Sequence, residues 1–72
     1  MSLRATGPAS LGVYDVSGRR VRTLLAGVQP AGSRTVTWDG RDDAGTQLRA
    51  GMYVLRLVAG ERIETRTVRL VR

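Results

Sequence analysis

The sequence predicts an all-β fold, an antiparallel sandwich or small barrel, and two observations carry this prediction. Short apolar and polar alternations recur about every ten residues, and turns rich in glycine separate them. The chain has 72 residues, of which 42% are hydrophobic, so its composition is that of one small globular domain. We therefore expect a single module over residues 1–72, built from about six or seven short strands.

The first part of the chain predicts one hairpin after a weakly patterned start. Residues 1–9 are expected to hold at most a frayed or truncated strand at Leu3–Ala5, with a turn at Gly7-Pro8. Leu11–Asp15 alternates as a strand. Its return strand, Arg19–Leu25, follows a turn that begins with aspartate and ends with glycine, the pattern of a type I hairpin turn.

The middle of the chain predicts a loop and then a strand. Gly27–Gly32 is expected to be a loop or crossover, because Pro30 cannot donate to a sheet ladder. Ser33–Trp38 alternates cleanly, with Val36 and Trp38 on one face. A segment rich in aspartate and glycine follows directly.

The end of the chain predicts a second hairpin around a tight turn at Ala59–Arg62. Met52–Val58 is the most hydrophobic strand. In the last strand, Ile63–Val71, the apolar residues of the two ends have opposite parity, so we expect a bulge near Thr65–Thr67. The predicted core consists of Leu11, Val13, Val21, Val36, Trp38, Leu48, Tyr53, Leu55, Leu57, Val68 and Leu70.

The net charge of +6 raises the alternative of a free-standing basic module that binds nucleic acid or another polyanion. We favour a simpler interpretation, in which arginine has replaced lysine through a GC-rich coding sequence, since the chain has no lysine. The arginines are also spread along the chain rather than clustered. They are Arg4, Arg19, Arg20, Arg22, Arg34, Arg41, Arg49, Arg56, Arg62, Arg66, Arg69 and Arg72.

The residue inventory argues against catalysis. Cysteine, histidine and lysine are all absent, so a serine nucleophile would lack its usual base. Glycoside hydrolysis needs two carboxylates held on either side of a cleft. Glu61 and Glu64 lie on one hairpin, and the chain is too small to enclose a pocket, so we do not expect them to act as such a pair. We predict no enzyme, with no catalytic, cofactor-binding or metal-binding residues, and no cofactor; the binding residues are unknown.

The segment from Trp38 to Gly45 allows two interpretations. Asp39, Asp42 and Asp43 could offer oxygen ligands to calcium, but aspartate and glycine are also what tight turns require, and Arg41 would repel a cation. We favour the turn-forming role, and we expect Trp38 to fill the core rather than serve as an exposed binding platform.

No targeting or membrane segment is evident. No apolar run approaches the roughly 18 residues of a membrane span, and Met1–Ala5 lacks the pattern of a signal peptide. The arginines of the terminal hairpin are expected to be solvated and to protect an edge strand from pairing.

Taken in order, four motifs of the chain resemble the Ig-like domain of flagellar hook-capping proteins. They are Val13–Leu24, then Pro30-Ala31-Gly32, then Trp38–Gly45, then Gly51-Met52-Tyr53, and the resemblance covers Leu11 to Arg72. It implies an Ig-like or fibronectin-III-like β-sandwich without catalytic residues.

The same resemblance implies a structural, adhesive or sorting role. Such modules occur at the C-terminus of larger secreted or surface bacterial proteins, so the expected partners are proteins: domains of the parent chain, secretion or surface machinery, or a second copy. The family commonly has a first strand before the first hairpin, and only Leu3–Ala5 could represent it here. An incomplete edge would favour pairing with another chain.

Overall fold

The computed structural model describes residues 2–33 and 35–71, and within them it contains strands and no helix. All strand pairs are antiparallel, which confirms the predicted all-β class. The strands are β1 (Ser2–Leu3), β2 (Gly7–Tyr14), β3 (Arg20–Leu25), β4 (Val28–Gln29), β5 (Gly32–Ser33), β6 (Gly51–Ala59) and β7 (Arg62–Leu70).

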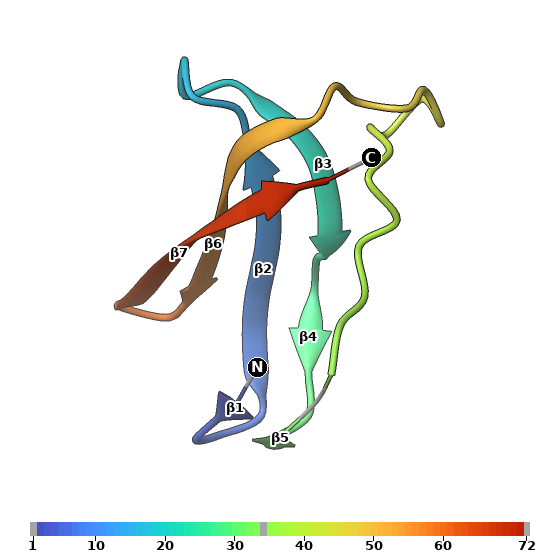
Figure 1. Cartoon of the computed structure of the whole chain (residues 1–72). Helices are drawn as coiled ribbons and strands as arrows, with labels where there is room; N and C mark the ends of the chain where they lie inside the picture. The colour runs from blue at the N-terminus through green and yellow to red at the C-terminus, as the bar shows by residue number, and fades with distance from the viewer. Residues whose placement is uncertain (1, 34, 72) are drawn as a thin grey trace.

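The main sheet has the strand order β3-β2-β6-β7, and β4 continues the β3 side along the start of β2 (Figure 1). The expected turn at Gly7-Pro8 is wrong, because β2 begins at Gly7 and both residues pair with β4. A proline at the start of a strand removes only one ladder donor, so Pro8 is tolerated there.

Both predicted hairpins form. In the first, the Gly18 N–H donates to the Asp15 carbonyl oxygen at 3.0 Å, and Gly18 has a φ of 89°. In the second, Gly60 has a φ of 60°, whereas Glu61 has no positive φ. A glycine at the first central position with an ordinary residue behind it is the type II′ turn, whose twist matches that of the flanking strands.

The register between β6 and β7 runs without interruption from Gly51 opposite Leu70 to Ala59 opposite Arg62. The expected bulge near Thr65–Thr67 is therefore wrong. The apolar residues at the two ends of β7 lie on opposite faces of the sheet, and Ile63 points away from the core and is 55% exposed. Single apolar side chains are common on protein surfaces, so no bulge is needed to bury Ile63.

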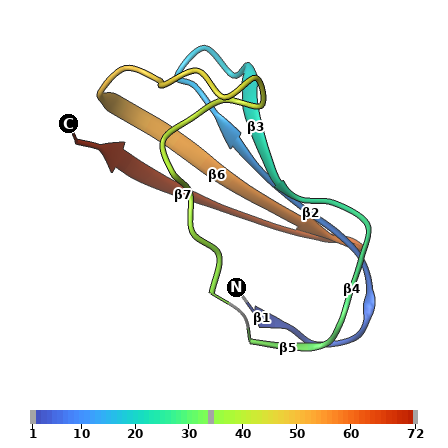
Figure 2. The same ribbon diagram turned by 90° about the vertical axis from the view of Figure 1, so that its right-hand side faces the viewer.

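The second layer is sparse. It consists of the short sheet β1–β5 and the segment from Thr35 onward, which runs back along the main sheet (Figure 2). The expected strand over Ser33–Trp38 is wrong, because only Gly32–Ser33 pairs as a strand, residues 35–38 carry no strand assignment and Arg34 lies outside the described residues. An alternating sequence becomes a strand only where another strand lies beside it to pair.

The core is smaller than predicted. Val13 is fully buried, at 0% exposure, whereas Val36 and Trp38 are only half-buried because little chain covers the second layer. The radius of gyration is 12.4 Å, compared with about 11 Å for a compact domain of this length. The buried apolar residues are Leu3, Ala9, Leu11, Val13, Tyr53 and Leu57.

Candidate functional site

The aspartate-rich segment, residues 38–48, is held by its own carboxylates. Asp42 Oδ1 accepts hydrogen bonds from the backbone N–H groups of Ala44 at 3.0 Å and Thr46 at 2.9 Å. The Gly45 N–H donates to the Asp42 carbonyl oxygen, and Gly45 has a φ of 86°. These contacts are the turn-forming chemistry of aspartate followed by glycine.

The same segment is fastened to the edge of β3. Asp43 Oδ1 accepts from the Thr23 N–H at 3.0 Å, and the Asp43 N–H donates to the Val21 carbonyl oxygen at 3.1 Å. The Arg22 guanidinium donates to the carbonyl oxygens of Asp42 at 3.1 Å and Arg41 at 3.3 Å. Residues 38–48 therefore cover the backbone edge that β3 would otherwise leave open.

Trp38 and Tyr53 join this segment to β6. Their rings meet edge to face with centroids 5.3 Å apart, and Trp38 Nε1 donates to the Arg41 carbonyl oxygen at 3.0 Å. The Tyr53 hydroxyl donates to the Arg49 carbonyl oxygen at 2.7 Å. Each ring thus packs with its apolar body and satisfies its polar atom locally, as buried Trp and Tyr side chains usually do.

The carboxylates of Asp39, Asp42 and Asp43 are occupied by protein donors. Asp39 Oδ1 accepts from the Arg41 N–H at 3.0 Å and lies 3.5 Å from Arg22 Nη1. Within residues 2–33 and 35–71, no group of three His, Cys, Asp or Glu side chains is placed to hold a metal ion. The geometry brings the three aspartates into one segment and directs them to backbone amides and to one arginine.

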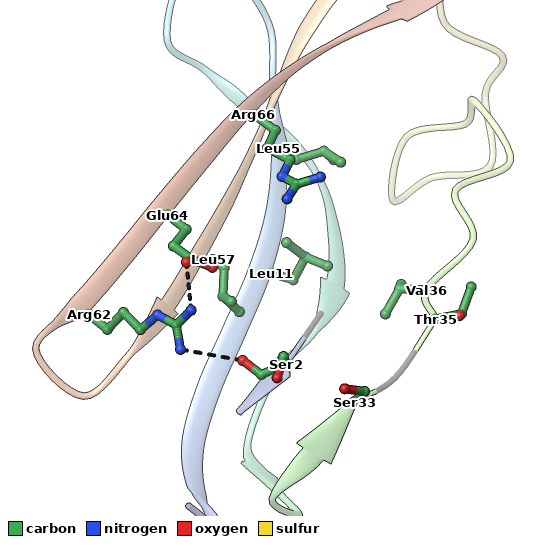
Figure 3. A pocket seen from close by; sticks show the side chains of 10 residues that line it. All are labelled: Ser2, Leu11, Ser33, Thr35, Val36, Leu55, Leu57, Arg62, Glu64 and Arg66. Atoms are coloured by element: carbon green, nitrogen blue, oxygen red, sulfur yellow. Dashed lines mark hydrogen bonds and ion pairs between the residues drawn. The ribbon is translucent and has the colours of Figure 1, made fainter. Parts of the chain in front are cut away.

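A second feature, a groove of about 690 Å³, opens between the main sheet and the second layer (Figure 3). Its apolar floor is formed by Leu11, Leu55 and Leu57 of the sheet, and Val36 lies across the opening on the segment after β5. Polar and charged side chains complete the lining: Ser2, Ser33, Thr35, Arg62, Glu64 and Arg66.

The charged wall of this groove comes from β7. Arg62 Nη2 donates to Glu64 Oε1 at 2.6 Å, and Arg62 Nη1 reaches the Ser2 carbonyl oxygen at 3.5 Å. The hydrogen bond from Arg62 lowers the pKa of Glu64 below its ordinary value, and the charge of Arg66 adds to that effect. Arg66 itself forms no hydrogen bond or ion pair with the described residues. With Arg62 paired to Glu64, this wall of the groove has a net positive charge.

The sequence prediction did not include this groove, although one signal for it was present. Arg62, Glu64 and Arg66 share the parity of Val68 and Leu70, so charged residues occupy the inner face of a strand. Charged residues on the inner face of an edge strand are typical of strands that are protected from uncontrolled pairing.

The family model of the FlgD Ig-like domain matches residues 2–62. This chain belongs to the FlgD Ig-like domain family. Membership confirms the resemblance found in the sequence and the Ig-like class of the fold.

Two curated relatives of this FlgD Ig-like domain carry the name basal-body rod modification protein FlgD, one from Salmonella typhimurium and one from Salmonella typhi. Each is 43% identical to the chain over 47 residues, which cover 65% of this chain and 20% of the relative. The chain therefore spans about a fifth of the length of these relatives. No solved structure matches it.

None of the described residues lies in a helix long and apolar enough to cross a membrane.

Proposed function

We propose that this FlgD Ig-like domain, over residues 1–72, is a non-catalytic structural and interaction module of a larger bacterial protein. Family membership carries this proposal, because the matching region makes up only 20% of its relatives, which are named as proteins that modify the basal-body rod. A module of this kind holds a larger protein in an assembly by binding protein surfaces. Its partners are domains of the parent chain or components of the assembly.

The described side chains support a role without chemistry. Histidine and cysteine are absent from the chain. Asp15 caps a hairpin turn, Asp42 and Asp43 hold backbone amides, and Glu64 is paired with Arg62. These four described carboxylates therefore serve turns, backbone amides or an arginine, which supports a structural use of them rather than general acid–base catalysis.

We further propose that the parent protein acts outside the cytoplasm, as a secreted or cell-surface protein with this module as a C-terminal appendage. The sequence resemblance to appended domains of exported bacterial proteins supports this location. A parent gene that encoded this chain alone, without another domain and without an export signal, would contradict it.

The function is tested by removing the module from the parent protein. We expect the shortened parent to keep any enzymatic activity of its other domains and to lose its place in the cell-surface or assembly fraction. Fractionation followed by immunoblotting measures the location. Unchanged assembly without the module, or loss of a catalytic step that only this module could supply, would overturn the proposal.

A further inference from the structure

The pairing of the second layer stops after two residue pairs. β1 pairs with β5 through Ser2 opposite Ser33 and Leu3 opposite Gly32. The chain then runs on along the main sheet, and residues 35–38 have the alternating sequence of a strand without a strand assignment (Figure 2). Among the described residues, none forms a backbone hydrogen bond with residues 35–37. Their N–H and C=O groups are therefore available to a strand that lies beside them.

The line of β1 leads into the groove. On one side of β1 lies β5, and on the other Arg62 Nη1 of the β7 wall reaches the Ser2 carbonyl oxygen at 3.5 Å (Figure 3). An extended chain that continued β1 backwards from Ser2 would therefore run between residues 35–38 and the β7 wall, over the leucine floor of the groove. The groove is the space that one more strand of the second layer would fill.

The register fixes which positions of that strand face the floor. Opposed residues of an antiparallel pair share a face, and successive residues alternate between the faces. Carried beyond β5, the register sets the third residue before Ser2 opposite Val36 and the fifth opposite Trp38. Both positions have the parity of Leu3, which is buried at 6% exposure. Val36 lines the groove, so the two sides of the pair agree on the face that points inward.

The position of β1 also selects the occupant. Any strand on this line must end where Ser2 begins, and a segment joined to Ser2 by a peptide bond meets that condition directly. A separate strand would compete with residue 1 for this place and would lose its free motion on binding. A second copy would add repulsion between two chains of net charge +6. The matched region makes up 20% of the curated relatives, so a module of this kind occurs within a much longer chain.

We propose that the parent chain directly upstream of this module continues β1, pairs antiparallel with residues 35–38 and closes the groove. Its third and fifth residues before Ser2 are apolar and lie on the leucine floor. This inference rests on the proposed function, which supplies a parent chain before the module. It deepens that function by naming the partner of the groove as the parent's own upstream segment.

The test compares the chain of residues 1–72 with the same chain extended by the eight residues that precede Met1 in the parent. We expect the extended chain to have a Tm about 5 °C or more higher. We also expect hydrogen exchange of alternate amides within residues 35–38 to slow about tenfold or more, as measured by nuclear magnetic resonance. Charged residues at both the third and the fifth position before Ser2 in the parent's coding sequence would contradict the proposal.

A matched extension exchanges the third residue before Ser2 with the fourth and the fifth with the sixth. It keeps the composition and the charge but turns the apolar side chains to the other face, so we expect most of the Tm gain and of the protection to disappear. Val36→Asp should likewise abolish the gain that the native extension gives. Ile63→Asp is its control, because Ile63 points away from the core and should leave the gain unchanged.

Equal gains for the two extensions, or unprotected amides in residues 35–38, would overturn the proposal. So would a free peptide of the same eight residues that protects these amides of residues 1–72 at less than about 100 μM, because the groove would then suit a separate strand. Concentration-dependent dimerisation that protects them would assign the groove to a second copy.

Deletion of the module from the parent separates this inference from the proposed function. If the deletion abolishes assembly but the extension protects nothing, the module function stands and the upstream strand is wrong. If the extension protects residues 35–38 but the deletion leaves assembly unchanged, the strand stands and the proposed function is wrong.

Discussion

Trp38 is the residue that connects the aspartate-rich segment with the sheet. Its ring packs edge to face on Tyr53, and its Nε1 satisfies the Arg41 carbonyl oxygen. Trp38 is half-buried, and its contacts join residues 38–48 to Tyr53 of β6. The interpretation of Trp38 as a packing residue rather than an exposed platform agrees with both contacts.

We expect Trp38→Ala to destabilise the domain by about 2–4 kcal/mol, somewhat less than removal of a fully buried tryptophan. Trp38→Phe keeps the ring contact and loses the Nε1 hydrogen bond, so its cost should be about 1 kcal/mol. Urea unfolding followed by circular dichroism measures both. An unchanged unfolding midpoint for Trp38→Ala would show that the contacts of Trp38 do not stabilise the domain.

Asp15 makes the first hairpin sensitive to acid. Its Oδ1 accepts from the Ser17 hydroxyl at 2.6 Å and from the backbone N–H groups of Ser17 and Arg19 at 3.0 Å. The Ser17 hydroxyl is the main cause that lowers the pKa of Asp15 below its ordinary value, followed by the Arg19 N–H. The ionised carboxylate is thus the form that the folded hairpin prefers.

Because the pKa of Asp15 is lower in the folded state, its contribution to stability is complete above the pKa of the unfolded chain. It is lost as the pH falls through the folded value, below about pH 4. We expect Asp15→Asn to flatten the acid limb of a plot of Tm against pH. Glu61→Gln, at the exposed turn of the other hairpin, is the control that should leave that limb unchanged. Parallel acid limbs for wild type and Asp15→Asn would contradict the assignment.

At the scale of elements, the aspartate-rich segment serves as the cover of the β3 edge. The Arg22 side chain extends from β3 and donates to two carbonyl oxygens of the segment. Asp43 of the segment binds the β3 backbone twice: its carboxylate accepts from the Thr23 N–H, and its own N–H donates to the Val21 carbonyl oxygen. The ion pairs of Arg22 with Asp39 and Asp43 are long, at 3.5 and 3.9 Å, and both acids are exposed. The carbonyl contacts therefore contribute more than the ion pairs.

We expect Arg22→Ala to destabilise the domain by about 1–2 kcal/mol, because it leaves two carbonyl oxygens without this donor. Arg22→Lys should recover only part of the loss, since an ammonium cannot span both oxygens with a planar fork. Arg49→Ala is the matched control: Arg49 is exposed and contributes its backbone carbonyl to Tyr53, which the substitution keeps. Equal losses for Arg22→Ala and Arg49→Ala in chemical unfolding would contradict this role.

The occupied carboxylates of the segment also predict its response to metal. Asp39 and Asp42 already accept backbone N–H groups, and the Arg22 guanidinium lies 3.5 Å from the Asp39 carboxylate. We expect calcium or a chelator to change the Tm by less than about 1 °C, since only a ligand that prefers the folded state raises it. A rise in Tm that grows with calcium concentration would assign the aspartates to a metal site.

For the whole molecule, the basic charge is distributed rather than focused. Arg62 and Arg66 line the groove on the inner face, Arg56 and Arg69 have the opposite parity, and Arg22 is engaged with residues 38–48. A nucleic-acid-binding protein usually gathers its cations on one face. The arrangement favours the interpretation of the arginine content as a composition bias.

We expect duplex and single-stranded DNA to bind only at low salt, with half-saturation above about 100 μM near physiological ionic strength. Fluorescence anisotropy with labelled oligonucleotides over a salt series measures this. Submicromolar binding at physiological salt would favour the alternative of a polyanion-binding module.

Local chemistry made several elements predictable. The aspartate and glycine of the Asp15–Gly18 turn, the glycine of the second hairpin and the apolar alternation of β6 all act within a few residues, so the sequence alone identified them. The order of the motifs was also enough to identify the family. No candidate binding surface was predictable in the same way, because the groove is made by residues from both ends of the chain and its middle.

The all-β class, the two hairpins and the family were thus determined by the sequence itself, since turn chemistry and strand periodicity are local. The tertiary structure decided what Ser33–Trp38 becomes, how deeply Trp38 is buried and which sheet edge stays open. Each of these depends on whether a segment distant in sequence lies beside the residues in question, where it can form strand hydrogen bonds with them or bury their side chains. Residues 38–48 reach the β3 edge, whereas among the described residues no strand other than β6 pairs with β7, so one edge is covered and the other is not.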